Sequence, residues 1–327
     1  MNILITGGAG YIGSHVVKQL GELTDHRITT LDNLSTGNKD AVLYGEFIEE
    51  DLANFSEIEK IFKVKNFDAV MHFAGSIVVP ESVVNPMKYY MNNTVNTASL
   101  LNLCNIYRVK KFIFSSTAAV YGEPENKNVN IGELTKTAPI NPYGMTKLMI
   151  ECIIKDLGFA NPNFKYVILR YFNVAGADLD GRIGQDFPDA THLIKVAAQT
   201  VCGMRDKIYI FGDDYNTEDG TCIRDYIHVD DLSSAHLSAL KYLDNNNSDI
   251  FNCGYGYGFS VKEVIDTMKK VSGKDFQVEI TGKRAGDPAQ LVSDNNKIIS
   301  KMHWKPQYDN LEVICKTALD WEKKCNA

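Results

Sequence analysis

The segment NPYGMTK contains a tyrosine and a lysine, Tyr143 and Lys147, whose spacing suits acid–base chemistry. Pro142 is typical of the first turn of a helix, and residues four apart on a helix share one face. A phenol ordinarily has a pKa of about 10, and a neighbouring cation favours its ionised form. We therefore expect Tyr143 to act as a general base, with Lys147 beside it.

A second pair with this spacing, Tyr107 and Lys111, arises by chance and precedes a predicted strand, whereas the pair in NPYGMTK follows that strand. Ligands of parallel sheets bind beyond the carboxyl ends of the strands, so only the later pair is placed to meet one. Ser115, Ser116 and Thr117 end the same strand. We predict that Thr117 bonds to a substrate alcohol; the alternative is that these hydroxyls satisfy loop backbone groups.

Near the start of the chain, TGGAGYIG places Gly7, Gly8, Gly10 and Gly13 between an apolar run and a helical pattern. Such a turn lets the backbone approach a pyrophosphate, which the N-terminus of the following helix then binds. Asp32 ends the second predicted strand, where a carboxylate accepts from a ribose 2′-hydroxyl and repels a 2′-phosphate. We therefore predict that the chain binds NAD rather than NADP.

Short apolar runs alternate with helical patterns through the first half of the chain. Strands are predicted in NILIT, RITTLD, GEFIEEDL, FDAVMHFAG, KKFIFSS and KYVILRYFN, and helices lie between them. This alternation predicts an α/β fold, a doubly wound parallel sheet of the Rossmann type. After about residue 175 long loops rich in Gly and Asp break the rhythm. We expect an NAD-binding domain over 1–175, joined by 227–251, and a smaller C-terminal substrate domain over 176–327.

The composition excludes several classes of function. The chain has 327 residues and a formal net charge of −7, which disfavours binding to nucleic acid. It has no long apolar segment, so no membrane partner is expected. The seven cysteines are scattered and odd in number, which is typical of reduced packing residues in a cytoplasmic protein. The histidines show no metal-ligating pattern, and we expect no metal.

The motifs together identify a family. TGGAGYIG, HFAG, YYMNNTVNT, FSSTAAVYG, NPYGMTK and LRYFNVAGA resemble the extended short-chain dehydrogenase/reductase superfamily. TEDGTCIRDYIHVDDL and KRAGDPA resemble its UDP-glucose 4-epimerase family, and the resemblance runs from end to end. It implies interconversion of UDP-galactose and UDP-glucose by transient oxidation at sugar C4, through a 4-keto intermediate. Tyr143 would be the base, Lys147 would hold the nicotinamide ribose, Thr117 would bond to O4, and NAD would stay bound throughout.

The same resemblance implies the remaining site residues. Those of the NAD site are Gly7, Gly10, Tyr11, Ile12, Gly13, Asp32, Asn33, Leu34, Ser35, Thr36, Gly37, Asp51, Leu52, Phe73, Ala74, Gly75, Asn93, Tyr143, Lys147 and Phe172. Those of the UDP-sugar site are Thr117, Tyr143, Asn173, His192, Leu193, Arg224, Arg284, Asp287 and Leu291. The arginines suit the diphosphate because their planar forks match phosphate oxygens. The alternative for either arginine is a surface ion pair with Asp225 or Asp287.

Three positions depart from the pattern of the family. Ile77 stands where some members carry a lysine that reaches the cofactor, and Lys195 stands where proline is common. Leu291 is intermediate in size at a position that controls the room beside the C2 substituent of the sugar. We therefore expect turnover of UDP-glucose and UDP-galactose with some capacity for N-acetylated UDP-hexosamines.

Other functions are weighed against this one. A nucleotide-sugar 4,6-dehydratase needs an acid–base pair directly after Thr117, where this chain has Ala118 and Ala119. A UDP-glucuronate 4-epimerase stays open, because recognition of a carboxylate is hard to read from loops. A non-catalytic NAD-binding sensor needs neither Tyr143 nor Lys147. By analogy with the fold, two long predicted helices, in residues 87–104 and from Tyr143, pair with a second copy in a homodimer.

Overall fold

Strands and helices form where the sequence alternates short apolar runs with helical patterns. The computed structural model describes residues 1–124, 129–187, 191–284 and 287–326. NILIT is strand β1 (Asn2–Thr6), and YIGSHVVKQLGEL is helix α1 (Tyr11–Leu23), as predicted. The chain forms two compact units, the first from residues 1–122, 137–170 and 233–251, and the second from 123–136, 171–232 and 252–327.

The first unit contains the predicted alternation of strands and helices. Beyond β1 and α1, its strands are β2 (Arg27–Asp32), β3 (Glu46–Glu49), β4 (Ala69–His72), β5 (Lys111–Thr117), β6 (Lys165–Tyr171) and β11 (Asp249–Cys253). Its helices are η1 (Lys39–Ala41), α2 (Phe55–Val64), α3 (Val79–Val84), α4 (Pro86–Tyr89), η2 (Tyr90–Val95), α5 (Asn96–Ile106), η3 (Ala118–Tyr121), α6 (Pro142–Ala160) and α8 (Val229–Asn245).

Seven strands form one sheet in the order β11-β6-β5-β4-β1-β2-β3. The pairs β1–β2, β1–β4, β2–β3 and β4–β5 are parallel. The order reverses between β1 and β4, and ligands of such sheets bind beyond the strand ends at this point. The predicted doubly wound α/β fold is therefore confirmed, and its switch point lies at the glycine-rich turn.

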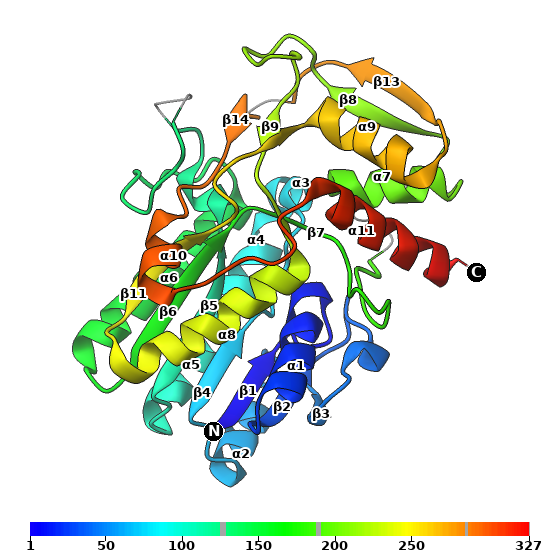
Figure 1. Cartoon of the computed structure of the whole chain (residues 1–327). Helices are drawn as coiled ribbons and strands as arrows, with labels where there is room; N and C mark the ends of the chain where they lie inside the picture. The colour runs from blue at the N-terminus through cyan, green and yellow to red at the C-terminus, as the bar shows by residue number, and fades with distance from the viewer. Residues whose placement is uncertain (125–128, 188–190, 285–286, 327) are drawn as a thin grey trace. The chain divides into compact units, whose positions relative to one another are not determined.

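Helices cover both faces of this sheet, which explains why its central strands β1, β4 and β5 are largely buried. On one face, α2, α5 and α6 form a core with alternate strand residues, including Leu4, Val70, Phe112 and Ile168. Helices α1 and α8 lie together on the other face (Figure 1).

The long helix predicted from Met87 is interrupted. Residues 86–89 form α4 and residues 96–106 form α5, and the six residues of η2 between them form a π-helical turn. Asn93 lies in this turn and is 1% exposed. π-helical turns insert an extra residue into the hydrogen-bond ladder and are frequent at functional sites. Helical periodicity in the sequence does not reveal such an insertion.

The second unit is built from shorter elements. Its strands are β7 (Asn173–Ala175), β8 (Lys207–Phe211), β9 (Ile223–Arg224), β10 (Tyr226–His228), β12 (Phe259–Ser260), β13 (Gln277–Thr281) and β14 (Gln290–Leu291). Its helices are α7 (Leu193–Val201), α9 (Val261–Ser272), α10 (Asn296–Met302) and α11 (Leu311–Cys325). Within the described ranges, no helix is long and apolar enough to cross a membrane.

The two units differ from the expected domains 1–175 and 176–327 at three places. Residues 123–136 belong to the second unit, where Ile131 bridges to Ser293. The chain passes into the second unit at Tyr171, the last residue of β6, where residue 176 was expected, because the next strand, β7, pairs with β10 of the second unit. The returning segment begins at Ser233, within α8, where residue 227 was expected.

A buried ion pair between Lys195 and Glu322 joins two helices of the second unit. The ammonium of Lys195 lies 2.5 Å from Glu322 Oε2 and donates to the carbonyl of Gln185, also at 2.5 Å. The side chains of Lys195 and Glu322 are 8% and 2% exposed. The lysine therefore ties the start of α7 to the C-terminal helix α11.

Replacing Lys195 with Met should lower the free energy of unfolding by about 3–5 kcal/mol, because it leaves the carboxylate of Glu322 buried without its cation. Chemical denaturation measures this change. The control is Lys316→Met, which breaks an exposed pair with Asp320 and should cost less than about 1 kcal/mol. The double variant Lys195→Met/Glu322→Leu should recover most of the loss. Equal effects of the two single changes would contradict this account.

Candidate active site

The glycine-rich turn joins β1 to α1 at the switch point of the sheet. Gly7 has φ +73°, and a Cβ on it would lie 2.4 Å from the backbone nitrogen of Ala74. A Cβ on Gly13 would lie 2.2 Å from the carbonyl oxygen of Gly7. Side chains at these two positions would therefore block the packing of the turn. Tyr11 and Ile12 follow Gly10 as the first residues of α1.

Asp32 lies at the end of β2, beside this turn. Its carboxylate accepts hydrogen bonds from the N–H of Ala9 at 3.0 Å and of Leu34 at 2.9 Å. Burial raises the pKa of Asp32, and these two hydrogen bonds act in the opposite direction. The loop that follows, from Asn33 to Gly37, returns to the glycine-rich turn, where the N–H of Asn38 donates to the carbonyl of Ala9.

The other predicted residues of this loop region have mixed surroundings. Asn33 donates to the carboxylate of Asp51 at 2.7 Å, so these two residues are brought together. Leu34 adopts a positive φ of 56°, and Ser35 and Thr36 follow it. Leu52 packs against the core beneath the sheet, as its apolar character alone would suggest.

The segment Phe73–Gly75 continues β4 toward the same edge. The N–H groups of Phe73 and Ala74 both donate to the carbonyl of Thr6. Asn93, from the π-helical turn, accepts from the N–H of Ser76 at 2.7 Å and donates to the hydroxyl of Thr146 at 3.1 Å. It therefore ties this segment to helix α6.

Tyr143, Lys147 and Thr117 meet at the carboxyl end of β5. Asn141 caps α6 by accepting from the N–H of Gly144, and Pro142 is the first helical residue, as predicted. The ammonium of Lys147 donates to the carbonyl of Ser115 at 2.9 Å. Tyr143 is 8% exposed and Lys147 is 3% exposed. Both groups of the predicted pair are therefore buried on one face of the helix.

Burial works against the charged form of both groups. It raises the pKa of Tyr143 to about 12, while a hydrogen bond with Thr117 acts in the opposite direction. It lowers the pKa of Lys147 to about 8, while the carboxylate of Glu151 acts in the opposite direction. The chain alone therefore favours a neutral phenol at Tyr143. A further positive charge at the site is needed to favour the phenolate.

The serine hydroxyls beside Thr117 have protein partners. Ser115 bonds to His236 at 3.0 Å, and Ser116 donates to Glu151 at 2.6 Å. Thr117 is only partly buried, and its hydroxyl accepts from the N–H of Ala119 at 3.1 Å. Of the three residues that end this strand, Thr117 is the one that is not fully buried.

In the second unit, Arg224, Asp287 and Leu291 lie together. Arg224 donates to the carbonyl oxygens of Ile223 and Pro288, and its guanidinium lies 3.2 Å from Asp287 Oδ1. Leu291, in β14, is paired with Arg224 in the ladder between β9 and β14. The ion pair that the sequence offered as an alternative for Arg224 therefore forms.

A hollow of about 270 Å³ adjoins these residues. Arg284 lies near it and places its guanidinium 3.6 Å from the ring centroid of Phe211. Guanidinium groups stack on aromatic faces, so this contact holds an exposed cation in place. The hollow is lined by Glu123, Pro124, Tyr215, Asn216, Lys283, Asp287, Pro288, Ala289 and Gln290.

The remaining predicted residues of the second unit lie in other elements. Phe172 is 7% exposed, and Asn173 begins β7. His192 directly precedes α7, which begins at Leu193, and its Nδ1 lies 3.2 Å from Nε2 of Gln185. His192 lines a small cavity with Gln185, Lys195 and other residues, apart from the hollow beside Asp287.

Sequence reasoning missed three residues of these surroundings. Glu151 and Arg170 form a buried ion pair near Lys147. The aromatic ring of Phe211 contacts the guanidinium of Arg284. Glu151 interrupts the apolar run LMIECII and Arg170 interrupts YVILRYF. A charged residue within an apolar run is a signal of a buried ion pair and could have identified both.

The residues at the glycine-rich turn fit a dinucleotide. A Cβ on Gly10 would meet one atom within 4 Å, the carbonyl oxygen of Gly7 at 3.3 Å, so the backbone here leaves room for close approach. Helix α1 begins without a side-chain cap, so its first N–H groups suit a phosphate. The two oxygens of Asp32 each receive one hydrogen bond, and a carboxylate has lone pairs for more.

Comparison with known proteins identifies relatives along the full chain. UDP-glucose 4-epimerase of Azospirillum brasilense is 50% identical over 325 residues, covering 98% of this chain and 92% of that protein. The structure of the UDP-Glc/GlcNAc 4-epimerase from Campylobacter jejuni matches with a TM-score of 0.88 and 58% identity, covering 99% of both chains. UDP-glucose 4-epimerase from Brucella ovis in complex with NAD matches with a TM-score of 0.93 and 41% identity, over 98% of this chain and 97% of that one.

A family model extends over most of the chain. Residues 3–254 match the model of the NAD dependent epimerase/dehydratase family, and this range contains the glycine-rich turn, Asp32, Tyr143 and Lys147. The chain belongs to the NAD dependent epimerase/dehydratase family.

Proposed function

We propose that the chain interconverts UDP-galactose and UDP-glucose by transient oxidation of the sugar at C4, with NAD retained. The observation that carries this proposal is the buried pair of Tyr143 and Lys147 on α6, where Lys147 bonds to the end of β5, in the same parallel sheet whose strand β1 leads into the dinucleotide-fitting turn. The family and the full-length epimerase relatives support the same reaction.

Each residue of the pair has a distinct task. Tyr143 takes the proton from the C4 hydroxyl and returns it after the sugar has turned, and Thr117 bonds to the same oxygen. Lys147 keeps its positive charge beside the phenol at neutral pH, below its pKa of about 8. Bound NAD⁺ supplies the reversible hydride acceptor and a second positive charge. Together the two charges oppose the burial that raises the pKa of Tyr143.

The dehydratase reaction finds less support. Elimination of water from C5 and C6 needs an additional acid and base after the threonine. Here Ala118 and Ala119 begin η3 directly after Thr117, and neither side chain transfers a proton. A 4-keto-6-deoxy sugar as the only product from the purified chain would overturn the proposal.

The UDP part of the substrate is assigned to the second unit. Arg224 and Arg284 are proposed to bind the diphosphate, with Asp287 orienting Arg224 and Leu291 beside the sugar. Asn173, His192 and Leu193 are proposed to complete this site. The bidentate geometry of guanidinium groups suits phosphate oxygens.

N-acetylated UDP-hexosamines are proposed as further substrates. Leu291 is smaller than tyrosine and larger than alanine, so it leaves intermediate room. The Campylobacter jejuni protein, 58% identical to this chain, is described as a UDP-Glc/GlcNAc 4-epimerase, which supports the same breadth here.

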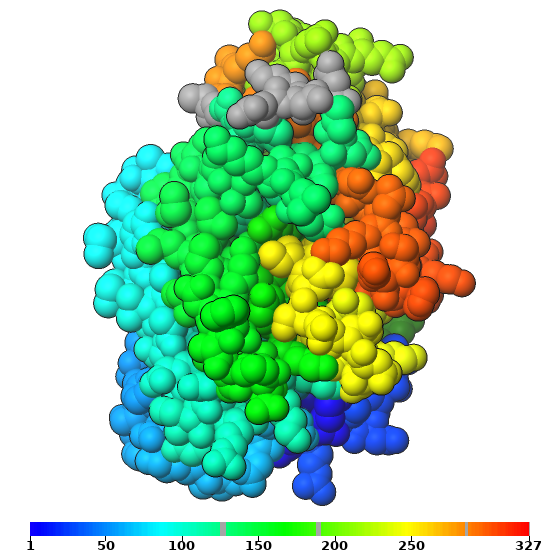
Figure 2. Space-filling view, turned by 90° about the vertical axis from the view of Figure 1, so that its left-hand side faces the viewer, coloured from blue at the N-terminus to red at the C-terminus, as the bar shows by residue number. Residues whose placement is uncertain are grey.

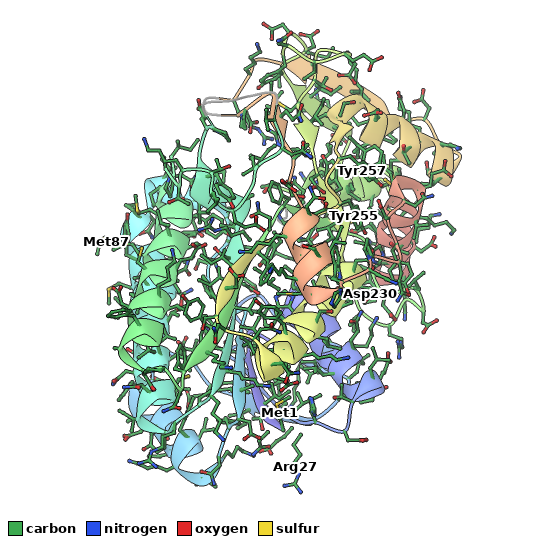
Figure 3. The ribbon with its side chains drawn as sticks, turned by 60° about the vertical axis from the view of Figure 1, so that its left-hand side comes forward. Met1, Arg27, Met87, Asp230, Tyr255 and Tyr257 are labelled. Carbon is green, nitrogen blue, oxygen red and sulfur yellow. The ribbon has the colours of Figure 1, made fainter. Side chains whose placement is uncertain are left out.

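A homodimer is also proposed, through an apolar surface formed by exposed residues of α4, η2 and α6. Met87, Met91 and Val95 recur every fourth residue along α4 and η2 and are exposed, and Met145 and Met149 are exposed on α6. Figure 2 shows this face, with the cyan segment that contains α4 and η2 beside the green α6, and Figure 3 shows Met87 at its outer edge. Large exposed apolar patches mark protein interfaces, and a second copy brings an identical apolar patch.

A cytoplasmic location stays a prediction from composition.

Replacing Tyr143 with Phe should lower the rate of epimerisation about 10²–10⁴-fold, because it removes the general base. The measurement is conversion of UDP-galactose to UDP-glucose by protein purified without added NAD. Co-purified NAD, released on denaturation and assayed, should be unchanged. The matched control is Tyr107→Phe, the tyrosine of the second pair, whose hydroxyl bonds only to Glu59 at the surface among the described contacts. A variant that keeps its full rate would remove Tyr143 from the mechanism.

Replacing Leu291 with Tyr should lower kcat/KM for UDP-N-acetylglucosamine at least about tenfold relative to UDP-galactose, because the larger ring fills the space of the acetamido group. Steady-state kinetics with both substrates measures the ratio. Leu291→Met, which conserves volume, serves as the control and should leave the ratio within a few-fold. An unchanged ratio in the tyrosine variant would show that Leu291 does not determine specificity.

Replacing Met91 with Glu should convert the dimer to a monomer, because it places a charge in the centre of the apolar surface. Light scattering after gel filtration measures the mass. Val64→Glu, at the exposed end of α2, is the control and should leave the mass unchanged. A monomeric wild-type protein would contradict the proposed dimer.

A further inference from the structure

Glu151 is a buried carboxylate on the face of α6 that carries the catalytic pair. It lies four residues beyond Lys147 and eight beyond Tyr143, and it is 0% exposed. A buried charge is costly unless it is paired and hydrogen-bonded. Its surroundings must therefore supply a cation and donors.

Arg170 and Ser116 supply them. Arg170, from β6, donates from Nε to Oε1 of Glu151 at 2.9 Å and forms a second bond to Oε2 at 2.5 Å, a bidentate pair. Ser116 donates to Oε1 at 2.6 Å. Arg170 is 2% exposed, and its remaining nitrogen donates to the hydroxyl of Tyr121 at 3.0 Å.

The position of this pair matters more than its strength. Buried ion pairs contribute little net stability, and apolar residues of similar volume often replace them without loss. This pair, however, is linked to Lys147 through adjacent residues of one strand. The carbonyl of Ser115 accepts from Lys147, and the hydroxyl of Ser116 donates to Glu151. The two charges thus act on the ammonium from a fixed position.

The net electrostatic effect depends on all charged and titratable groups around Lys147. His72 contributes no charge, because burial and the nearby Lys147 lower its pKa to about 3. Lys155, whose side chain is 39% exposed, places its ammonium 3.9 Å from Oε2 of Glu151. The groups on the elements packed around this face include His72 on β4, Tyr89 on α4, Tyr121 on η3, Tyr143, Glu151 and Lys155 on α6, Tyr166 and Arg170 on β6 and His236 on α8.

We propose that Glu151 and Arg170 are positioning residues whose opposite charges offset each other beside Lys147, so that neither buried charge displaces the ionisation of Lys147 and Tyr143 during turnover. This inference rests on the proposed epimerase function. Glu151 stabilises the ammonium and Arg170 limits that effect. With both charges present, the ionisation of Lys147 and Tyr143 is the same as it would be with neither charge.

Glu151 and Arg170 have opposite charges, so removing one or the other should displace the pH profile in opposite directions. A pair with a purely structural role would not show this behaviour. Glu151→Gln leaves the positive charge of Arg170 unbalanced, so the pH profile of kcat should move to lower pH by about one unit. Arg170→Gln leaves the carboxylate unbalanced, so the profile should move to higher pH by a similar amount. Two controls should keep the wild-type profile: Arg170→Lys, which retains the charge, and the double variant Glu151→Gln/Arg170→Gln.

A second measurement does not depend on turnover. In the NAD-loaded protein, the ultraviolet absorbance difference between each variant and its Tyr143→Phe counterpart reports the ionisation of Tyr143. Its midpoint should move down in Glu151→Gln and up in Arg170→Gln. If these shifts appear in a chain that does not epimerise UDP-galactose, the proposed function fails and the positioning role stands.

Two outcomes would overturn the positioning role. One is a loss of activity in both single variants with neither the pH profile nor the tyrosine midpoint displaced, which is the behaviour of a purely structural pair.

The second outcome concerns the double variant, which decides the question if the single variants do not fold, with circular dichroism as the control for folding. A folded double variant whose profile is displaced by a full pH unit would show that the two charges do not balance each other.

Discussion

The burial of a cation, the ammonium of Lys147, is the constraint on which the first unit depends. This ammonium is held inside the protein, where burial works against its charge, and its hydrogen bond to Ser115 fixes it at the end of β5. The sheet supplies that carbonyl and α6 supplies the lysine, while the glycine-rich turn follows β1, which is separated from β5 by β4. A buried lysine is tolerated only where several elements contribute partners, so the site and the packing of the fold have to be considered together.

Much of this arrangement could be predicted from local patterns. The strand NILIT, the turn after it, Asp32 at the end of β2 and the helix from Pro142 all depend on residues close together in sequence. Local propensity and apolar spacing are enough to place such elements. The parallel order of the strands follows from their alternation with helices.

Other features depend on contacts between distant segments, and sequence patterns did not reveal them. The π-helical turn at Tyr90–Val95 has the apolar spacing of an ordinary helix, yet it directs Asn93 to Ser76 and Thr146. The bond between Ser116 and Glu151 joins residues 35 apart. The second unit was hardest to predict, because its short strands pair with partners far away in the sequence, as β8 does with β13.

The division of the chain into interleaved segments has a consequence for its synthesis. The sheet of the first unit takes its outermost strand, β11, from residues 249–253, so more than three-quarters of the chain must leave the ribosome before β6 gains that neighbour. Until then an apolar strand has an open edge, which favours association with other nascent chains. No single cut in the sequence releases either unit intact, and fragments obtained by limited proteolysis will be expected to stay together or to unfold together.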